Sequence, residues 1–158
     1  VGSDQGVGGV AMYKYCYLDF DASTDVPRVF REYREGIDRL KAANPGLTIV
    51  HITVPLTSGE APARALIKRI LGKPTVLDAN AKRNEFNALL RQTYGSHEAL
   101  FDLAALESTR SDGSRSFAAR GADTVYTLAA EFTDDGGHLN ARGRRHVAVP
   151  FLDLLASL

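Results

Sequence analysis

The chain lacks several features that would place it in a specialised class of protein. It has one cysteine among 158 residues, so no disulfide can form within it. The 19 basic and 19 acidic side chains cancel, so no overall field favours nucleic acid or acidic lipid as a partner. No apolar run is long enough to cross a membrane. The composition therefore indicates neither a nucleic-acid partner nor a membrane span.

What is present is the composition of an ordinary globular domain. Apolar residues make up 44% of the sequence and charged residues 24%, which argues against disorder. A chain of this length fits one domain with a sizeable core. It starts at Val1 rather than at methionine, which is typical of a processed product or a partial sequence. We expect it to be the C-terminal two-thirds of a longer protein.

Apolar periodicity predicts strands and helices in alternation. Residues 1–9, rich in glycine and polar residues, are expected to be a flexible lead-in to a domain over residues 10–158. Runs of β-branched and aromatic residues predict buried strands over residues 10–18, 47–54 and 99–103. Amphipathic patterns predict helices between Asp25 and Asn44, through Leu66 and up to Gly72, over residues 80–94, and over residues 141–155.

Three local features of this pattern carry further predictions. Arg83 is expected to point outward from its helix, because the apolar residues around it define the opposite face. Pro150 is expected to kink the last helix or divide it in two. Residues 107–123, rich in serine, arginine and glycine, are expected to form an irregular loop.

The predicted fold class is α/β. Strands that alternate with helices imply a parallel sheet with helices on both faces, and reactive groups in such folds gather at the carboxyl ends of the strands. A sheet of only three strands would expose an apolar edge and would be poorly stable alone. We therefore expect this edge to bind a missing N-terminal fragment or another copy of the chain.

The strongest chemical signal is an acid three residues before a histidine, Asp135 and His138, on a turn that opens the last helix. A histidine works as a general base when a carboxylate fixes its tautomer and stabilises the imidazolium that forms. The two glycines between them allow a tight turn, and Asn140 can cap the following helix. This pattern favours an acid and base pair on the rim of the domain.

The block Asp-Gly-Gly-His-Leu-Asn at residues 135–140, with Gly143 after it, resembles the terminal block of SGNH (GDSL-like) hydrolases. Other segments resemble one bacterial branch of that superfamily: residues 13–20, 50–57, 84–87 and 101–103. The resemblance implies a flavodoxin-like, three-layer α/β/α fold with a parallel sheet of about five strands, the first two being absent here. It also implies an esterase in which Asp135 orients His138.

The chain departs from the family pattern at the nucleophile and at the oxyanion hole. The family places its serine after a first strand, whereas Ser3 of Gly2-Ser3-Asp4 has no strand before it. The family's Gly-x-Asn-Asp turn reads Tyr-Leu-Asp-Phe-Asp at residues 17–21, without the asparagine. Asp19 and Asp21 are candidates to lie near the site, but an ionised acid cannot donate to an oxyanion.

Simpler interpretations stand beside the functional ones. Asp135 could cap a turn while His138 packs at the helix start, and a metal site built from Asp134, Asp135 and His138 would have too few separated ligands. The remaining candidates are interpreted as structural or loop residues: His51, His97, His146, Cys16, Ser108, Ser111, Ser114, Ser116 and the basic run 142–145. Thr57 and Ser58 are positioned either to touch a substrate or to form a turn.

Two hypotheses follow from these observations. The first is a serine ester hydrolase of SGNH type that acts on acyl or acetyl esters, for example of carbohydrates, and that needs no cofactor or metal. Asp135 and His138 would be its acid and base, with the serine outside this chain. The second is an inactive binding or assembly module that keeps the fold without the nucleophile.

Overall fold

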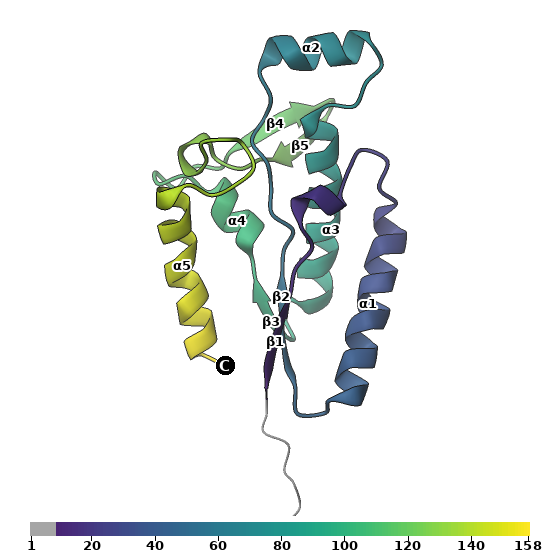
Figure 1. The fold of residues 1–158 in the computed structure, drawn as a ribbon, viewed down its shortest axis with the longest axis vertical. Coiled ribbons are helices and arrows are strands. Elements are labelled where there is room, and N and C mark those ends of the chain that lie inside the picture. The colour runs from purple at the N-terminus through teal and green to yellow at the C-terminus, as the bar shows by residue number, and fades with distance from the viewer. Residues whose placement is uncertain (1–8) are drawn as a thin grey trace, which may run out of the picture.

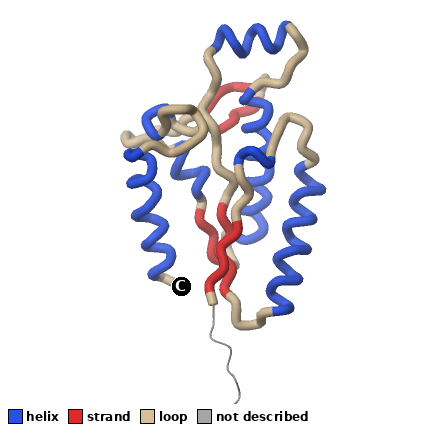
Figure 2. The backbone as a smooth tube through the Cα atoms, viewed as in Figure 1, coloured by secondary structure: helices blue, strands red, loops and turns tan. Residues whose placement is uncertain are grey.

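The computed structural model describes residues 9–158, which form a mixed α/β domain around a three-stranded parallel sheet. The strands are β1 (Val10–Tyr13), β2 (Thr48–Ile52) and β3 (Ala99–Phe101), and they lie in the order β1-β2-β3. β1 and β3 are the two edges of this sheet, which Figures 1 and 2 show edge-on between the helices. The predicted lead-in, apart from Gly9, and the Gly2-Ser3-Asp4 segment lie outside the described residues.

Five α-helices and a small hairpin complete the domain. The helices are α1 (Val26–Ala43), α2 (Pro62–Ile70), α3 (Val76–Tyr94), α4 (Leu103–Ser108) and α5 (Ala141–Ala156). Two 3-10 turns, η1 (Tyr17–Asp19) and η2 (Ala130–Phe132), and the antiparallel strands β4 (Phe117–Arg120) and β5 (Asp123–Tyr126) lie between them. No helix among the described residues is long and apolar enough to span a membrane.

Helices cover both faces of the sheet, as the sequence predicts. On one face, α1 and α3 enclose a core that includes Ile49, Phe30 and Phe86. On the other face, α4 and α5 pack against Val50 and Phe101. Successive residues of β2 thus face opposite layers, which is the arrangement expected for a strand that is buried on both sides.

The predicted helix after Asp25 is confirmed, and its sequence explains both ends. The Asp25 side chain accepts a hydrogen bond from the backbone N–H of Arg28, and Pro27 lies in the first turn. Phe30, Tyr33 and Ile37 recur at helical spacing and are buried. Asn44 ends the helix.

The prediction of a buried strand over residues 10–18 is wrong in extent and in burial. Pairing with β2 stops at Tyr13, and the chain then forms η1. Val10 and Met12 are each 49% exposed. The physical reason is that β1 is an edge strand, which has a neighbouring strand on one side only among the described residues.

The prediction of an irregular loop over residues 107–123 is also wrong. Asp102 caps α4 by accepting from the backbone N–H of Ala105, so the helix runs on to Ser108. The strands β4 and β5 then form a hairpin whose turn places Gly121 at a φ of 63°. Short elements of this kind give too few repeats for apolar periodicity to reveal them.

Pro150 does not divide α5, which runs as one helix from Ala141 to Ala156. Proline removes one backbone donor from a helix. Here Val147, Phe151 and Leu154 pack against the sheet, and the ring of Phe151 lies 4.9 Å from that of Phe101, centroid to centroid. These contacts lie on both sides of Pro150 in the sequence.

Glu107 leads to a testable prediction on stability. Its carboxylate is buried, accepts one hydrogen bond from the backbone N–H of Leu56 at 2.8 Å, and has a pKa that burial raises to about 7. Because the folded state holds the proton more tightly than the unfolded state, the free energy of unfolding falls as pH rises from about 4.5 to about 7. The loss is about 3 kcal/mol from this group.

The variant Glu107→Gln should abolish most of this loss, because an amide oxygen can accept the same hydrogen bond without taking a charge. Urea unfolding at pH 5 and pH 8 measures the effect. The variant should be more stable than the wild type at pH 8 and similar to it at pH 5. Equal destabilisation of the variant at both pH values would contradict the titration of Glu107.

Candidate active site

The loop before α5 holds Asp135 against His138. One carboxylate oxygen of Asp135, Oδ1, accepts hydrogen bonds from the backbone N–H groups of Gly137 and His138, both at 2.8 Å. The other oxygen, Oδ2, lies 2.7 Å from Nδ1 of the His138 ring. The structure therefore brings together the two residues that the sequence singles out, in the geometry of a carboxylate that orients an imidazole.

The electrostatics of the loop keep Asp135 ionised. The backbone donors of His138 and Gly137, followed by the His138 ring, hold the pKa of the Asp135 carboxyl well below its usual range. An ionised carboxylate on Nδ1 leaves Nε2 as the ring nitrogen that can accept a proton. The His138 and Asp135 side chains are 72% and 58% exposed, so the pair lies on the rim of the domain.

Asn140 joins this loop to α5, as predicted. Its side-chain oxygen accepts from the backbone N–H groups of Arg142 and Gly143, both at 3.0 Å. Thr133 and Leu139 pair across the loop as an isolated bridge. The base of the loop is thus fixed at both ends, which limits where His138 can lie.

Tyr17 is a neighbour of His138 that sequence reasoning missed. Its hydroxyl lies 3.4 Å from Nε2 of His138, and the two rings meet edge to face at 5.6 Å between centroids. The hydroxyl distance is long for a hydrogen bond, so Nε2 remains free for a closer partner. Among the described residues, no serine, threonine or cysteine is hydrogen-bonded to that nitrogen.

Arg83 holds the Tyr17 segment in place, and the prediction that it points outward is wrong. It is 5% exposed and donates to the carbonyl oxygens of Tyr17 and Phe20 and to the side chains of Thr57 and Asn80. Burial lowers the pKa of its guanidinium. Two of these bonds reach carbonyl oxygens of the segment after β1, far away in the sequence, which periodicity along α3 cannot reveal.

A cleft of about 650 Å³ opens beside the pair, on the side of Asp135. Its wall includes Tyr17, Ser58 and Arg64 together with the loop residues 135–137. The backbone N–H of Ser58 donates to the carbonyl oxygen of Gly136 at 2.8 Å, which joins the segment after β2 to the loop. This volume lies within the range of small-molecule sites.

The two acids of the Tyr-Leu-Asp-Phe-Asp segment have different positions. Asp21 lines the cleft, and its carboxylate accepts hydrogen bonds from Ser23. Asp19 accepts from the backbone N–H of Cys16 and stabilises η1. Thr57 is buried and bonded to Asn80 and Arg83, so its hydroxyl supports the wall.

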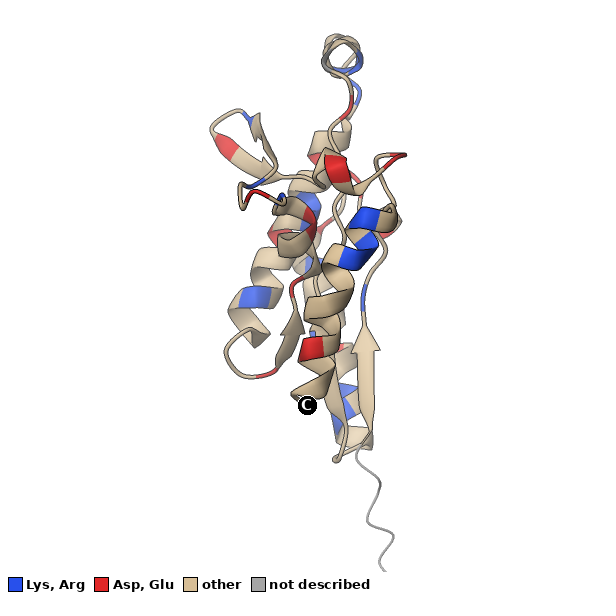
Figure 3. Ribbon diagram, turned by 90° about the vertical axis from the view of Figure 1, so that its left-hand side faces the viewer, with Lys and Arg blue, Asp and Glu red and all other residues tan. Residues whose placement is uncertain are grey.

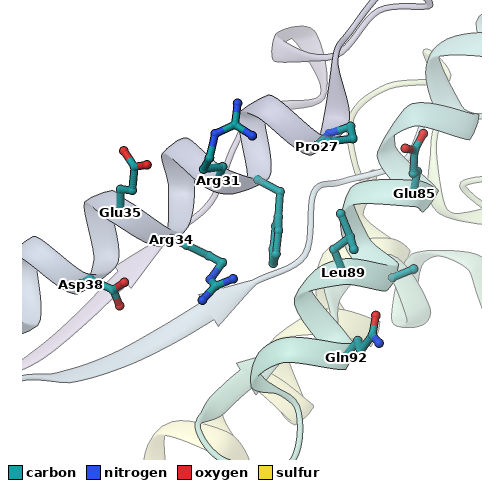
Figure 4. Close-up of a pocket in the computed structure, with 10 residues that line it drawn as sticks. Pro27, Arg31, Arg34, Glu35, Asp38, Glu85, Leu89 and Gln92 are labelled. Carbon is teal, nitrogen blue, oxygen red and sulfur yellow. The ribbon is translucent and has the colours of Figure 1, made fainter.

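A second hollow, of about 700 Å³, lies between α1 and α3 (Figure 4). Charges of both signs line it, including Arg31, Arg34, Glu35 and Asp38. It holds no residue of the 133–140 loop, whereas Asp135, Gly136 and Gly137 line the cleft. The cleft beside Asp135 is therefore the better candidate for chemistry.

The other candidate residues have structural partners or lie apart. His51 is buried between Tyr33 and Glu98, which bond its two ring nitrogens at 2.6 and 3.0 Å. His146 stacks on Phe132, and His97 is exposed in a loop. Cys16 is half-buried rather than buried. No group of three potential ligands that could hold a metal occurs among residues 9–158.

The serines of residues 108–116 are not bonded to His138. Ser108 donates to the carbonyl oxygen of Ala104, and Ser111 bonds to Glu131. Ser114 bonds to Asp112 through its backbone, and Ser116 shares a hydrogen bond with Thr127. Each serves the local structure of the α4 end or of the hairpin.

Gly136 gives a prediction about the loop. It has a φ of 84°, and a Cβ added there would lie 2.7 Å from Oγ of Ser58. The variant Gly136→Ala should lower the free energy of unfolding by about 1–2 kcal/mol, from backbone strain and from displacement of Ser58.

The matched control for this variant is Gly121→Ala. Gly121 also has a positive φ, of 63°, but open space lies around its Cβ position. Chemical unfolding of both variants separates strain from crowding. Equal losses of unfolding free energy in the two variants would show that the contact with Ser58 does not contribute.

No family model, no curated protein and no solved structure matches this chain. The candidate site is therefore defined by the residues and the geometry described above.

Proposed function

We propose that this chain is the C-terminal part of a serine ester hydrolase of SGNH type, with Asp135 and His138 as its acid and base. The observation that carries the proposal is the 2.7 Å contact between Oδ2 of Asp135 and Nδ1 of His138, which leaves Nε2 free to take a proton. The parallel sheet with helices on both faces supports the flavodoxin-like arrangement that the resemblance implies.

The reaction would follow from this geometry in two stages. In the first, Nε2 of His138 takes the proton of a serine hydroxyl as the serine oxygen attacks the ester carbon, and the imidazolium then returns that proton to the departing alcohol. In the second, water attacks the acyl carbon with the same histidine as base, the bond to the serine oxygen breaks, and the histidine returns the proton to that oxygen as the carboxylic acid leaves. Asp135 stabilises the imidazolium at each stage.

The free edge of β1 supports the proposal that sequence outside this chain supplies the serine. Val10 and Met12 of this edge strand are half exposed, and β1 has no partner strand on its outer side among residues 9–158. A further parallel strand beside β1 would end at the same edge of the sheet as the cleft. A serine just after that strand would therefore lie near His138.

The proposed substrates are acyl or acetyl esters, for example of carbohydrates. The cleft is open, and polar or charged side chains lie on its wall, including Asp21, Ser58, Glu60 and Arg64. These groups can hydrogen-bond to hydroxyls on the alcohol side of an ester.

A small aryl acetate tests the proposal, because its hydrolysis releases a coloured alcohol and needs few substrate contacts. We expect a burst of alcohol followed by steady turnover, since the acyl-enzyme forms before water hydrolyses it. A rate no higher than that of buffer, in protein that is folded, would contradict the proposal.

One observation favours a second candidate, a non-catalytic binding or assembly module. Tyr17 is the hydroxyl beside Nε2 of His138, and the described residues supply no nucleophile there. This module would form dimers through the β1 edge and would not react with serine-directed fluorophosphonates. A labelled monomer would rule it out.

A further inference from the structure

Helix α2 presents its apolar face to solvent. Leu66 and Ile67 are 59% and 58% exposed, and Ile70 is 74% exposed. The half-buried residues of the helix are Ala65 and Lys68, so neither belongs to its large apolar side chains. Figure 1 shows α2 at the far end of the molecule, standing clear of the other helices. An amphipathic helix normally buries its apolar face, so this orientation needs an explanation.

Basic side chains flank this apolar face. Arg64, Arg69 and Lys73 are exposed, and no acid occurs between Glu60 and Asp78 in the sequence. Lys68 is engaged on the domain side, where its Nζ lies 2.8 Å from Oε2 of Glu60. Figure 3 shows basic residues, and no acidic ones, on this helix at the end of the molecule. The helix is therefore a local positive patch on a chain of zero net charge.

The same helix borders the candidate cleft. Glu60, Ala61 and Arg64, at the start of α2, line the cleft together with Asp135 and residues 136–137 of the loop. Anything that docks on the apolar face of α2 is thereby brought to the mouth of the cleft.

The charge pattern distinguishes among possible occupants of this face. A second copy of the chain, paired through α2, would bring Arg64, Arg69 and Lys73 of two molecules together, and like charges disfavour that contact. An anionic lipid surface offers an apolar interior to the leucine and isoleucine side chains of α2. It also offers negatively charged headgroups to the basic side chains beside them. A basic amphipathic helix is typical of such binding.

We propose that α2 docks on anionic lipid surfaces, with Leu66, Ile67, Ile70 and Leu71 inserted between headgroups and the cations in contact with them. Docking would place esters carried by the lipid phase at the mouth of the cleft. That choice of substrate rests on the proposed hydrolase function, whereas the docking itself does not.

Co-sedimentation with vesicles tests the docking. The vesicles are phosphatidylcholine alone and an equimolar mixture of phosphatidylcholine and phosphatidylserine. We expect binding to the mixed vesicles that weakens as salt is added, and much weaker binding to phosphatidylcholine. The double variant Ile67→Ser with Ile70→Ser should bind the mixed vesicles more than about ten-fold more weakly.

Two further variants sharpen the test. Arg69→Glu with Lys73→Glu should weaken binding to the mixed vesicles by at least about ten-fold. The matched control is Val149→Ser with Leu152→Ser, which removes two apolar side chains of 62% exposure from α5. This control should bind as the wild type does, and circular dichroism checks that each variant is folded.

Several results would overturn the proposal. One is a lack of binding to the mixed vesicles. Another is binding by the Ile67→Ser, Ile70→Ser variant that is as strong as that of the wild type. A third is a dimer in solution that dissociates in that variant. Binding to an acidic protein but not to the vesicles would overturn it as well. Vesicle binding without ester turnover would uphold the docking and count against the hydrolase, so the two proposals fail separately.

Discussion

Replacing His138 with alanine is expected to lower kcat for a small aryl ester by about 10⁴-fold or more in the protein that contains the nucleophile. The serine would lose the base that takes its proton, while the imidazole, 72% exposed, contributes little to packing. The fold should therefore remain intact. Steady-state kinetics with an aryl acetate measures the loss.

Asp135→Asn should have a similar effect for a different reason. An asparagine in this position can keep the loop bonds of residues 137 and 138, but it cannot stabilise the imidazolium, and it can favour the wrong tautomer. The control is His97→Ala, at an exposed loop histidine. Full turnover in the His138→Ala or the Asp135→Asn variant would contradict the assignment of this pair. An equal loss of turnover in the His97→Ala control would contradict it as well.

Replacing Phe86 with alanine is expected to lower the free energy of unfolding by about 4 kcal/mol. Phe86 is 1% exposed and lies at the centre of the core between α1, α3 and the sheet. Its ring contacts those of Phe20 and Phe30 at centroid distances of 5.2 and 5.6 Å. The substitution leaves a cavity that so many rigid rings cannot fill.

Phe117→Ala is the matched control, because it removes the same side chain from β4, where it is 59% exposed. Chemical denaturation should show a change of less than about 1 kcal/mol for this variant. A loss at Phe86 no greater than that at Phe117 would show that the core is packed differently from this description.

Features that depend on residues close together in the sequence could be predicted from the sequence alone. Asn140 caps the helix that it was predicted to cap, and Asp25 caps the helix predicted to follow it, because an acceptor beside free N–H groups acts over a few residues. The contact between Asp135 and His138 was predictable for the same reason, since the glycines between them allow one tight turn. The parallel order of the strands followed from their alternation with helices.

Long-range contacts could not be predicted from the sequence. Arg83 is buried because carbonyls of a distant turn need its donors, and no pattern along α3 records that need. Tyr17 meets His138 across 121 positions of sequence. The apolar side of α2 was predicted, but its exposure to solvent was not, because no local pattern records which way a helix faces.

The most direct test of the central proposal is to label the natural protein with a fluorophosphonate and to locate the adduct by mass spectrometry. We expect one labelled serine, outside the 158 residues of this chain, and loss of labelling in the His138→Ala variant. No adduct, an adduct on a serine within the chain, or labelling that does not depend on His138 would contradict it.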